Sequence, residues 1–278
     1  MRIITQADIR AFEQELYLNE KSRATVNKYV RAVEKLSEYM KGDKITKSRM
    51  LEYREQLQTQ NKAQTVNGAL SGINAFFRFM GWQDCRVKFL KIQHQAFLAE
   101  DRELSEAEYK RLLSAAKKQG NERLYLLMMT VCGTGIRISE LAYITVEAVK
   151  AGRAEVRMKG KSRTIILQRE LCGRLLRYAR KNQITEGYVF CTRSGKALDR
   201  SNVCHEMKRL CKAAEVDPHK VFPHNLRHLF ARAFYAVEYN LAHLADVLGH
   251  SRIETTRIYV AVSAAAHEKI LNKMKLVI

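Results

Sequence analysis

The chain has 278 residues, 46% of them hydrophobic, and carries 49 Lys and Arg against 29 Asp and Glu, a formal net charge of +20. This composition excludes a disordered polypeptide, and the length is sufficient for two ordinary domains. The positive excess must be solvated or matched by a polyanion, of which nucleic acid is the commonest and an anionic membrane surface the next. No apolar run approaches the ~18 residues that span a bilayer, so we expect no membrane partner.

The six cysteines are scattered along the chain without any C-x-x-C pair. This pattern argues against a zinc site and against a disulfide framework. The first six residues lead directly into a charged helix, and the chain shows no secretory apolar region. We therefore expect a cytoplasmic protein that uses no metal and no cofactor.

Residues 1–82 are predicted to form a helical domain. Hydroxyl side chains at Thr5 and Ser22 can cap two helices, each followed by apolar residues at helical spacing, and a third helix is expected to start at Thr46. A fourth helix is expected from about Ala63, because apolar residues recur from there until the glycine at 81. Four helices with short loops make a small bundle.

Residues 83–101 lack clear periodicity and are predicted to be a linker. The second domain, 102–278, opens with a capping-box pattern at Ser105. A buried helix is expected over 124–131, because apolar residues there are followed by two glycines, and another helix is expected over about 136–145.

The middle of the second domain predicts a small sheet. Two short β-like runs, 154–158 and 163–167, are joined by a tight turn at 159–162, and 189–191 is a candidate further strand. From about residue 201 onward the pattern is helical again. The predicted fold is mainly α with a small antiparallel β-sheet: an N-terminal helical bundle followed by a C-terminal mixed α+β domain.

Three short motifs carry side chains suited to phosphate chemistry. In chain order they are Gly133-Thr134-Gly135-Ile136-Arg137-Ile138-Ser139-Glu140-Leu141, His224-Asn225-Leu226-Arg227-His228, and Leu248-Gly249-His250 with Tyr259 nine residues later. Taken singly, each has an ordinary structural explanation. Arg137 can pair with Glu140 on one helical face, and a lone tyrosine is usually a half-buried core residue.

Taken together, the three motifs and a turn at Lys159 resemble the tyrosine recombinase, or phage integrase, family. The resemblance covers roughly residues 100–278, and the basic helical region 1–80 is similar to that family's core-binding domain in composition and helix count. It implies a site-specific DNA recombinase with a C-terminal helix. No arm-type DNA-binding domain is expected before residue 1, and a simple two-domain recombinase is therefore the expected type.

The resemblance implies a role for each site residue. Arg137 and Arg227 would hold the nonbridging oxygens of the scissile phosphate, and His224 and His250 would add hydrogen bonds to it. Tyr259 would attack the phosphorus atom and remain bound as a 3′-phosphotyrosine.

A lysine in the predicted turn would protonate the departing 5′ oxygen. Lys159 is favoured by its position in the sequence, counted from Arg137 and the preceding strand. Gly160, which follows it, suits a tight reversal of the chain. Lys161 is the alternative. Contact with the phosphate would keep either ammonium charged until its proton is transferred.

These residue types suit the transfer of a phosphodiester. A guanidinium stays charged and binds two oxygens at once, which matches the charge that spreads over the equatorial oxygens. The phenol has an ordinary pKa of about 10, which nearby cations lower, and a neutral histidine can accept its proton; the motifs leave open which group does so. A covalent ester conserves the broken bond, in agreement with a sequence that has neither a phosphate-binding G-x-x-x-x-G-K-[ST] loop nor an acidic cluster for two metals.

The expected partner is double-stranded DNA, bound by a homotetramer on two DNA sites, with an accessory or partner recombinase as an open alternative. Phosphate contacts are expected from Lys28, Arg31 and Lys62 on the first-domain helices, although such residues also fit a solvated face. Residues 265–278 carry an apolar stripe that would dock on a neighbouring subunit or fold onto their own domain.

Three other functions compete with this interpretation. A catalytically idle DNA-binding regulator on the same fold would not need all the candidate catalytic residues. A monomer that relaxes supercoils would keep the chemistry but not exchange strands. An RNA-binding helical protein would be expected to carry aromatic stacking motifs that this sequence lacks. The motifs leave open whether the outcome is integration, excision, inversion or dimer resolution.

Overall fold

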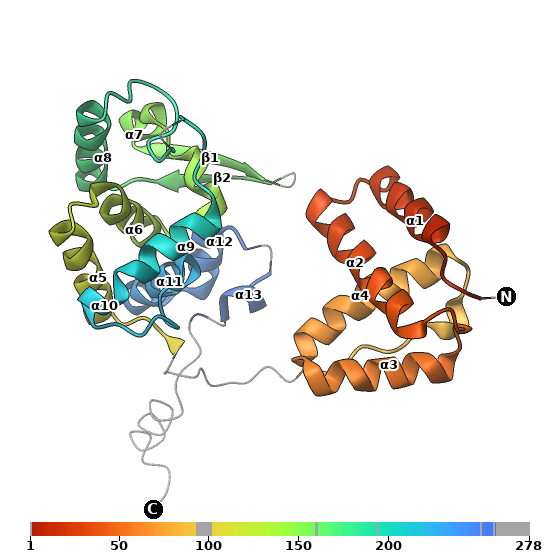
Figure 1. Ribbon diagram of the computed structural model, residues 1–278. Helices are drawn as coiled ribbons and strands as arrows, with labels where there is room; N and C mark the ends of the chain where they lie inside the picture. Colours follow the sequence, from red (N-terminus) through yellow and green to blue (C-terminus); the bar gives the residue numbers. More distant parts are fainter. Residues whose placement is uncertain are drawn as a thin grey trace, which may run out of the picture. The chain divides into compact units, whose positions relative to one another are not determined.

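The computed structural model describes residues 2–92, 102–158, 161–192, 194–250, 252–257 and 259, with the side chains of Met158 and Lys161 left out. The chain divides into two compact units, Met1–His94 and Gln95–Ile278, each built mainly of helices (Figure 1). Among the helices of these described ranges, none is long and apolar enough to cross a membrane.

The first unit is a bundle of four helices, α1 (Gln6–Leu18), α2 (Arg23–Met40), α3 (Lys47–Gln60) and α4 (Ala63–Phe79). The predicted N-caps at Thr5 and Ser22 are confirmed, and Thr46 caps α3 in the same way: each hydroxyl accepts a backbone N–H bond in the first turn. Helices α2 and α4 pack closely at Gly72, where an added Cβ would lie only 2.9 Å from the Tyr29 Cα.

Part of the segment expected to be a linker packs against the first unit. A 3-10 helix, η1 (Gln83–Cys85), follows α4. The buried amide of Asn74 then holds the backbone of Val87 in both directions, with distances of 2.9 and 3.1 Å. Asn67 binds the backbone of Leu90 in the same way. A side-chain amide that pairs with both the N–H and the C=O of one residue can hold a segment in place without any hydrophobic periodicity. The sequence pattern therefore gives no sign of this packing.

The second unit is mainly helical with one β-hairpin. Its elements are α5 (Glu106–Lys118), α6 (Glu122–Thr134), η3 (Ile138–Tyr143), α7 (Val146–Ala151), β1 (Arg153–Met158), β2 (Lys161–Ile166), α8 (Arg169–Lys181), α9 (Arg200–Arg209), α10 (Cys211–Ala214), α11 (Pro223–Glu238), α12 (Leu241–Leu248) and α13 (Glu254–Arg257).

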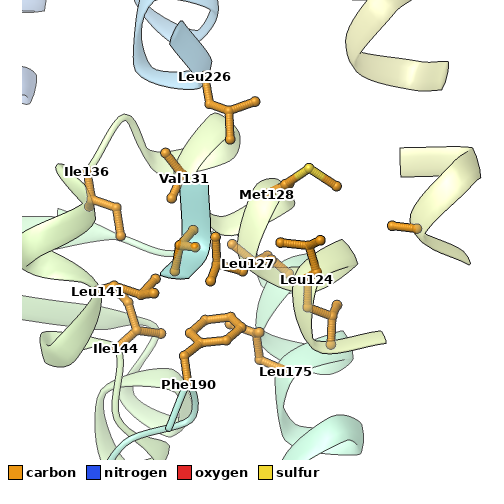
Figure 2. Close-up of a cluster of buried hydrophobic side chains, with 14 of the residues drawn as sticks. Leu124, Leu127, Met128, Val131, Ile136, Leu141, Ile144, Leu175, Phe190 and Leu226 are labelled. Atoms are coloured by element: carbon orange, nitrogen blue, oxygen red, sulfur yellow. The ribbon is translucent and has the colours of Figure 1, made fainter. Parts of the chain in front are cut away.

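Helix α6 forms the centre of the second unit. It packs against α5, α8 and α11. Figure 2 shows its apolar side chains directed into one buried cluster with Leu175 of α8, Phe190 and Leu226 of α11. Because the C-terminal end of α6 and the beginning of α11 share this core, the first and second sequence motifs are brought side by side.

The hairpin is the only sheet within the described residues. Strands β1 and β2 pair antiparallel, from Arg153 opposite Ile166 to Met158 opposite Lys161. The expected third strand at 189–191 is wrong, since Cys191 makes only an isolated bridge with Ala197. The predicted fold class, mainly α with a small antiparallel sheet, is confirmed.

The helix expected over 136–145 is a shorter 3-10 helix, η3. Arg137 is extended (φ −74°, ψ 149°), so no helix can begin before residue 138. Thr145 is extended as well and caps α7, which ends η3 after two turns. The apolar spacing in this stretch fits either helix type, so periodicity alone does not separate them.

Candidate active site

The first motif places Arg137 through a glycine turn at the end of α6. Gly135 adopts a left-handed conformation (φ +66°) and ends the helix. An added Cβ at this position would collide with the ring of Phe230 on α11. Only glycine therefore permits both the turn and the close approach of the two helices. The chain then runs through buried Ile136 to the extended Arg137.

Glu140 holds both the backbone and the side chain of Arg137. Its carboxylate accepts bonds from the Arg137 backbone N–H at 2.7 Å and from the Arg137 Nη1 at 2.9 Å. The carboxylate also pairs with Arg163 of β2 at 2.5 Å, while the residue itself is buried. Burial raises the pKa of Glu140, but the Arg137 N–H and the Arg163 charge outweigh it and hold the pKa below its ordinary value. The Arg137 side chain remains 39% exposed and can meet a ligand.

The second motif buries Arg227 completely. Its Nη1 donates to the Gly135 carbonyl at 2.6 Å, and its Nη2 donates to the Leu248 carbonyl at 2.8 Å. Burial, followed by the positive charge of Arg137, lowers the pKa of the guanidinium to about 10. The side chain therefore stays protonated near neutral pH and joins all three motifs at one point.

The third motif places His250 against this guanidinium. Helix α12 ends at Gly249 in a left-handed turn (φ +65°), and His250 follows. The His250 Nε2 lies 2.9 Å from the Arg227 Nη2. Because arginine can only donate, Nε2 must accept, which leaves the proton on Nδ1 for the bond to the Thr256 hydroxyl at 2.8 Å. Burial, together with the charge of Arg227, lowers the pKa of His250 to about 4.

Tyr259 lies in the same cluster and is 2% exposed. Its ring stacks on His250, with centroids 5.6 Å apart, and meets His228 edge-on at 4.5 Å. The hydroxyl lies 3.5 Å from the His224 Nε2, a long hydrogen bond, and is close enough to Arg227 to raise the pKa of that guanidinium. Arg227 has no exposed surface in this arrangement, so a phosphate can reach the guanidinium only after a covering group has moved.

The structure therefore brings together five predicted site residues, namely Arg137, His224, Arg227, His250 and Tyr259. Lys159 lies outside the described residues, as does the side chain of its alternative, Lys161. The predicted DNA contacts Lys28, Arg31 and Lys62 are all exposed on the first unit, the first two on α2 and the third at the start of α4.

Sequence reasoning missed two residues of this cluster. Arg163 looked like one of several charged residues in a β-strand, and Thr256 like a helix residue, so no sequence signal singled out either. Within the described part of the chain, no group of three or more His, Cys, Asp or Glu side chains could hold a metal ion.

The half-buried imidazoles of His228 and His250 predict a loss of stability in mild acid. Burial lowers the pKa of His228 and that of His250 to about 4 each, so both stay neutral in the folded protein. The unfolded chain takes up these protons below about pH 6.5, so the free energy of unfolding should be greatest above that pH and fall as the pH drops towards about 4. Urea denaturation at several pH values measures this fall.

In His228→Gln, the free energy of unfolding should fall less steeply as the pH drops. This variant lacks one of the two imidazoles that take up a proton on unfolding. His219→Gln, at an exposed position, is the control for loss of an imidazole. An identical pH dependence in His228→Gln and the unchanged protein would contradict the assignment of a buried neutral His228.

A helical bundle, followed by a helical unit with one hairpin and a cluster of arginines, histidines and a tyrosine, is an arrangement shared with a known protein family. The Phage integrase family matches residues 102–266, and the phage integrase N-terminal SAM-like domain matches residues 9–84. The chain belongs to the phage integrase family.

Two curated relatives span almost the whole chain. Tyrosine recombinase XerA of Thermococcus kodakarensis is 28% identical over 279 residues, which cover 97% of this chain and 95% of that protein. Tyrosine recombinase XerD of Vibrio cholerae is 28% identical over 269 residues, covering 90% and 89%. Among solved structures, a lambda integrase dimer bound to a COC′ core site has the same fold, with a TM-score of 0.73 and 17% identity over 92% of this chain and 94% of that one.

Proposed function

We propose that this protein is a site-specific DNA recombinase that cleaves and rejoins duplex DNA through a 3′-phosphotyrosine. The observation that carries the proposal is the meeting of a buried phenol with two guanidiniums and two neutral histidines. Membership of the phage integrase family and the tyrosine recombinases among its relatives support the same function.

The proposed reaction is a balanced exchange of esters. The Tyr259 oxygen forms a bond to phosphorus while the bond from phosphorus to the 5′ oxygen breaks. Arg137 and Arg227 bind the nonbridging oxygens, where charge accumulates. We propose Lys159, with Lys161 as the alternative, as the donor of the proton that the 5′ oxygen takes up. Attack by a free 5′ hydroxyl reverses every step and regenerates the tyrosine, so no ATP is consumed.

His224 is the proposed acceptor of the tyrosine proton. Its Nε2 is 3.5 Å from the Tyr259 hydroxyl. His224 is exposed at the surface, yet partial desolvation of its ring and then the charges of neighbouring arginines lower its pKa, which keeps it neutral and able to accept a proton at neutral pH. The equivalent nitrogen of His250 is already occupied by Arg227, so His250 is less suited to this step.

Phosphate binding is proposed to start at the exposed groups. His224 and the 39% exposed side chain of Arg137 can meet a DNA phosphate first. Full engagement of Arg227 is then proposed to require movement of the Tyr259 ring, because the ring and the guanidinium are both buried. The same movement would bring the phenol oxygen toward the phosphorus atom.

Binding to DNA is proposed to involve both units. Lys28, Arg31 and Lys62 would contact phosphates from the first unit, and affinity should fall steeply with salt. We propose domains at 1–82 and 102–278, joined through 83–101, and assembly of four copies on two DNA sites, with an accessory or partner recombinase as an option. The C-terminal segment that would dock on a neighbour lies outside the described residues.

A covalent adduct tests this function. DNA sites are first enriched from a random duplex library by binding to the protein, then prepared with a nick close to the cleavage position. Cleavage next to the nick releases a short fragment, so the protein stays attached to the DNA and survives denaturing electrophoresis. We expect such an adduct, and mass spectrometry of its peptides should place the phosphate on Tyr259.

The competing functions predict other products. Bound DNA without any adduct would favour the idle DNA-binding regulator and overturn the proposed enzyme. Relaxation of a supercoiled plasmid in the absence of exchange between two sites would favour the topoisomerase-like alternative.

A further inference from the structure

Arg163 joins three parts of the second unit that are distant in sequence. It lies on β2, and its side chain is only 13% exposed. One terminal nitrogen pairs with Glu140 below Arg137, and the other donates to the Val247 carbonyl in the last turn of α12. Both ends of the guanidinium are therefore committed to protein groups, which leaves Arg163 without a role in binding phosphate directly.

The first contact bears on Arg137. Glu140 shares its buried carboxylate between the two guanidiniums, at 2.9 Å from the Arg137 Nη1 and 2.5 Å from the Arg163 Nη2. Two cations divide one negative charge. If Arg163 were absent, the carboxylate would have Arg137 alone as its counterion and would hold it away from a substrate phosphate.

The second contact bears on His250. The Val247 carbonyl belongs to the end of α12, where backbone acceptors lack helical partners. Gly249 follows, and an added Cβ there would lie 2.5 Å from the Arg163 Cδ and 3.0 Å from its Nε. The aliphatic part of the arginine side chain thus packs on the turn that immediately precedes His250. Through this turn, Arg163 supports the position of the His250 imidazole relative to Arg227.

The third part is the hairpin itself. Arg163 faces Val156 across the β1–β2 ladder, two residues after the first residue of β2. One side chain therefore ties the hairpin to the segment of Arg137 and to the turn of His250.

We infer that Arg163 is a positioning residue, which sets Arg137 and His250 in register for the DNA cleavage proposed above. The inference rests on that proposed function. A merely structural ion pair would stabilise the fold without changing the chemical step, whereas a positioning residue changes the cleavage rate of a protein that still folds and still binds DNA.

The test compares single-turnover formation of the covalent adduct with the equilibrium affinity for the same nicked DNA. Arg163→Ala is expected to slow adduct formation by about 100-fold, the loss typical of a misplacement near 1 Å at a reacting centre, with nearly unchanged affinity. Arg163→Lys keeps a cation but cannot span both partners, so its rate should lie between those of Arg163→Ala and the unchanged protein. Arg153→Ala, an exposed arginine on β1, is the matched control and should cleave normally.

A double-mutant cycle gives a second readout. Glu140→Gln removes the charge that Arg163 balances, so the loss of rate in the double variant should be smaller than the two single losses combined. Independent losses would contradict the coupling through Glu140.

The outcomes separate this inference from the proposed function. If the unchanged protein forms no adduct, the proposed function fails. If it forms an adduct on Tyr259 while folded Arg163→Ala cleaves at the same rate, only the positioning role fails. Should Arg163→Ala not fold, the decision passes to Arg163→Lys, and a normal cleavage rate in that variant overturns the role.

Discussion

Tyr259→Phe is expected to abolish the covalent adduct with nicked DNA while the affinity for that DNA stays nearly unchanged. The phenylalanine ring keeps the stacking on His250 and the edge contact with His228. The lost hydroxyl makes only a long bond to His224, so the free energy of unfolding should fall by no more than about 1 kcal/mol. No other oxygen can then form the ester, so the loss of adduct should be complete.

Denaturing electrophoresis of the trapped DNA and thermal denaturation of the free protein measure the two quantities. Tyr239→Phe, at a side chain that is 75% exposed, is the control for removal of a phenol elsewhere. An adduct that persists in Tyr259→Phe would assign the nucleophile to another residue. A large loss of stability would contradict the weak hydroxyl contact.

The sequence identified the cluster because each motif holds its side chain by local means. Glycines at 135 and 249 create the turns before Arg137 and His250, and both adopt the left-handed conformation that glycine favours. Glu140 three residues after Arg137 is a pair that helical spacing suggests. Such local determinants are readable in one sequence.

The burial of Arg227 was not readable in this way. His224, Arg227 and His228 lie on one helix, and a basic face of a helix usually points to solvent. Here that face is covered by His250 and Tyr259, which arrive from later parts of the chain. Only the packing of α11 against α6 and α12 decides the exposure, and no pattern within α11 records it.

The strand prediction failed, and the packing of the segment after α4 was not foreseen, where tertiary contacts replace periodicity. The run at 189–191 is apolar because Val189 and Phe190 enter the core, where they pack without a neighbouring strand. Residues 83–92 show no period, yet two asparagine amides hold them against α4. A side chain that binds backbone from a distance leaves no trace in the local pattern.

Replacing either arginine of the pair should reduce cleavage, but only one replacement should also damage the fold. For Arg137→Ala and Arg227→Ala we expect adduct formation to slow by about 10²–10³-fold each, the loss typical when one donor to a developing oxyanion is removed. Arg227→Ala also strands the carbonyls of Gly135 and Leu248, and each buried acceptor left without a donor costs about 1–3 kcal/mol. Arg137→Ala leaves Glu140 paired with Arg163, so its stability should change little.

Urea denaturation of both variants, beside their adduct rates, separates the two roles of Arg227. Arg227→Lys sharpens the comparison, because it keeps the positive charge but offers its donors from a single nitrogen, which cannot reach both carbonyls and a phosphate oxygen. We expect Arg227→Lys to recover part of the stability and little of the cleavage. Normal cleavage in Arg227→Lys would show that charge alone suffices, and equal stability losses in the two alanine variants would contradict the different burial of the two guanidiniums. Equal stability losses would mean that Arg227 does not link the three motifs into one site.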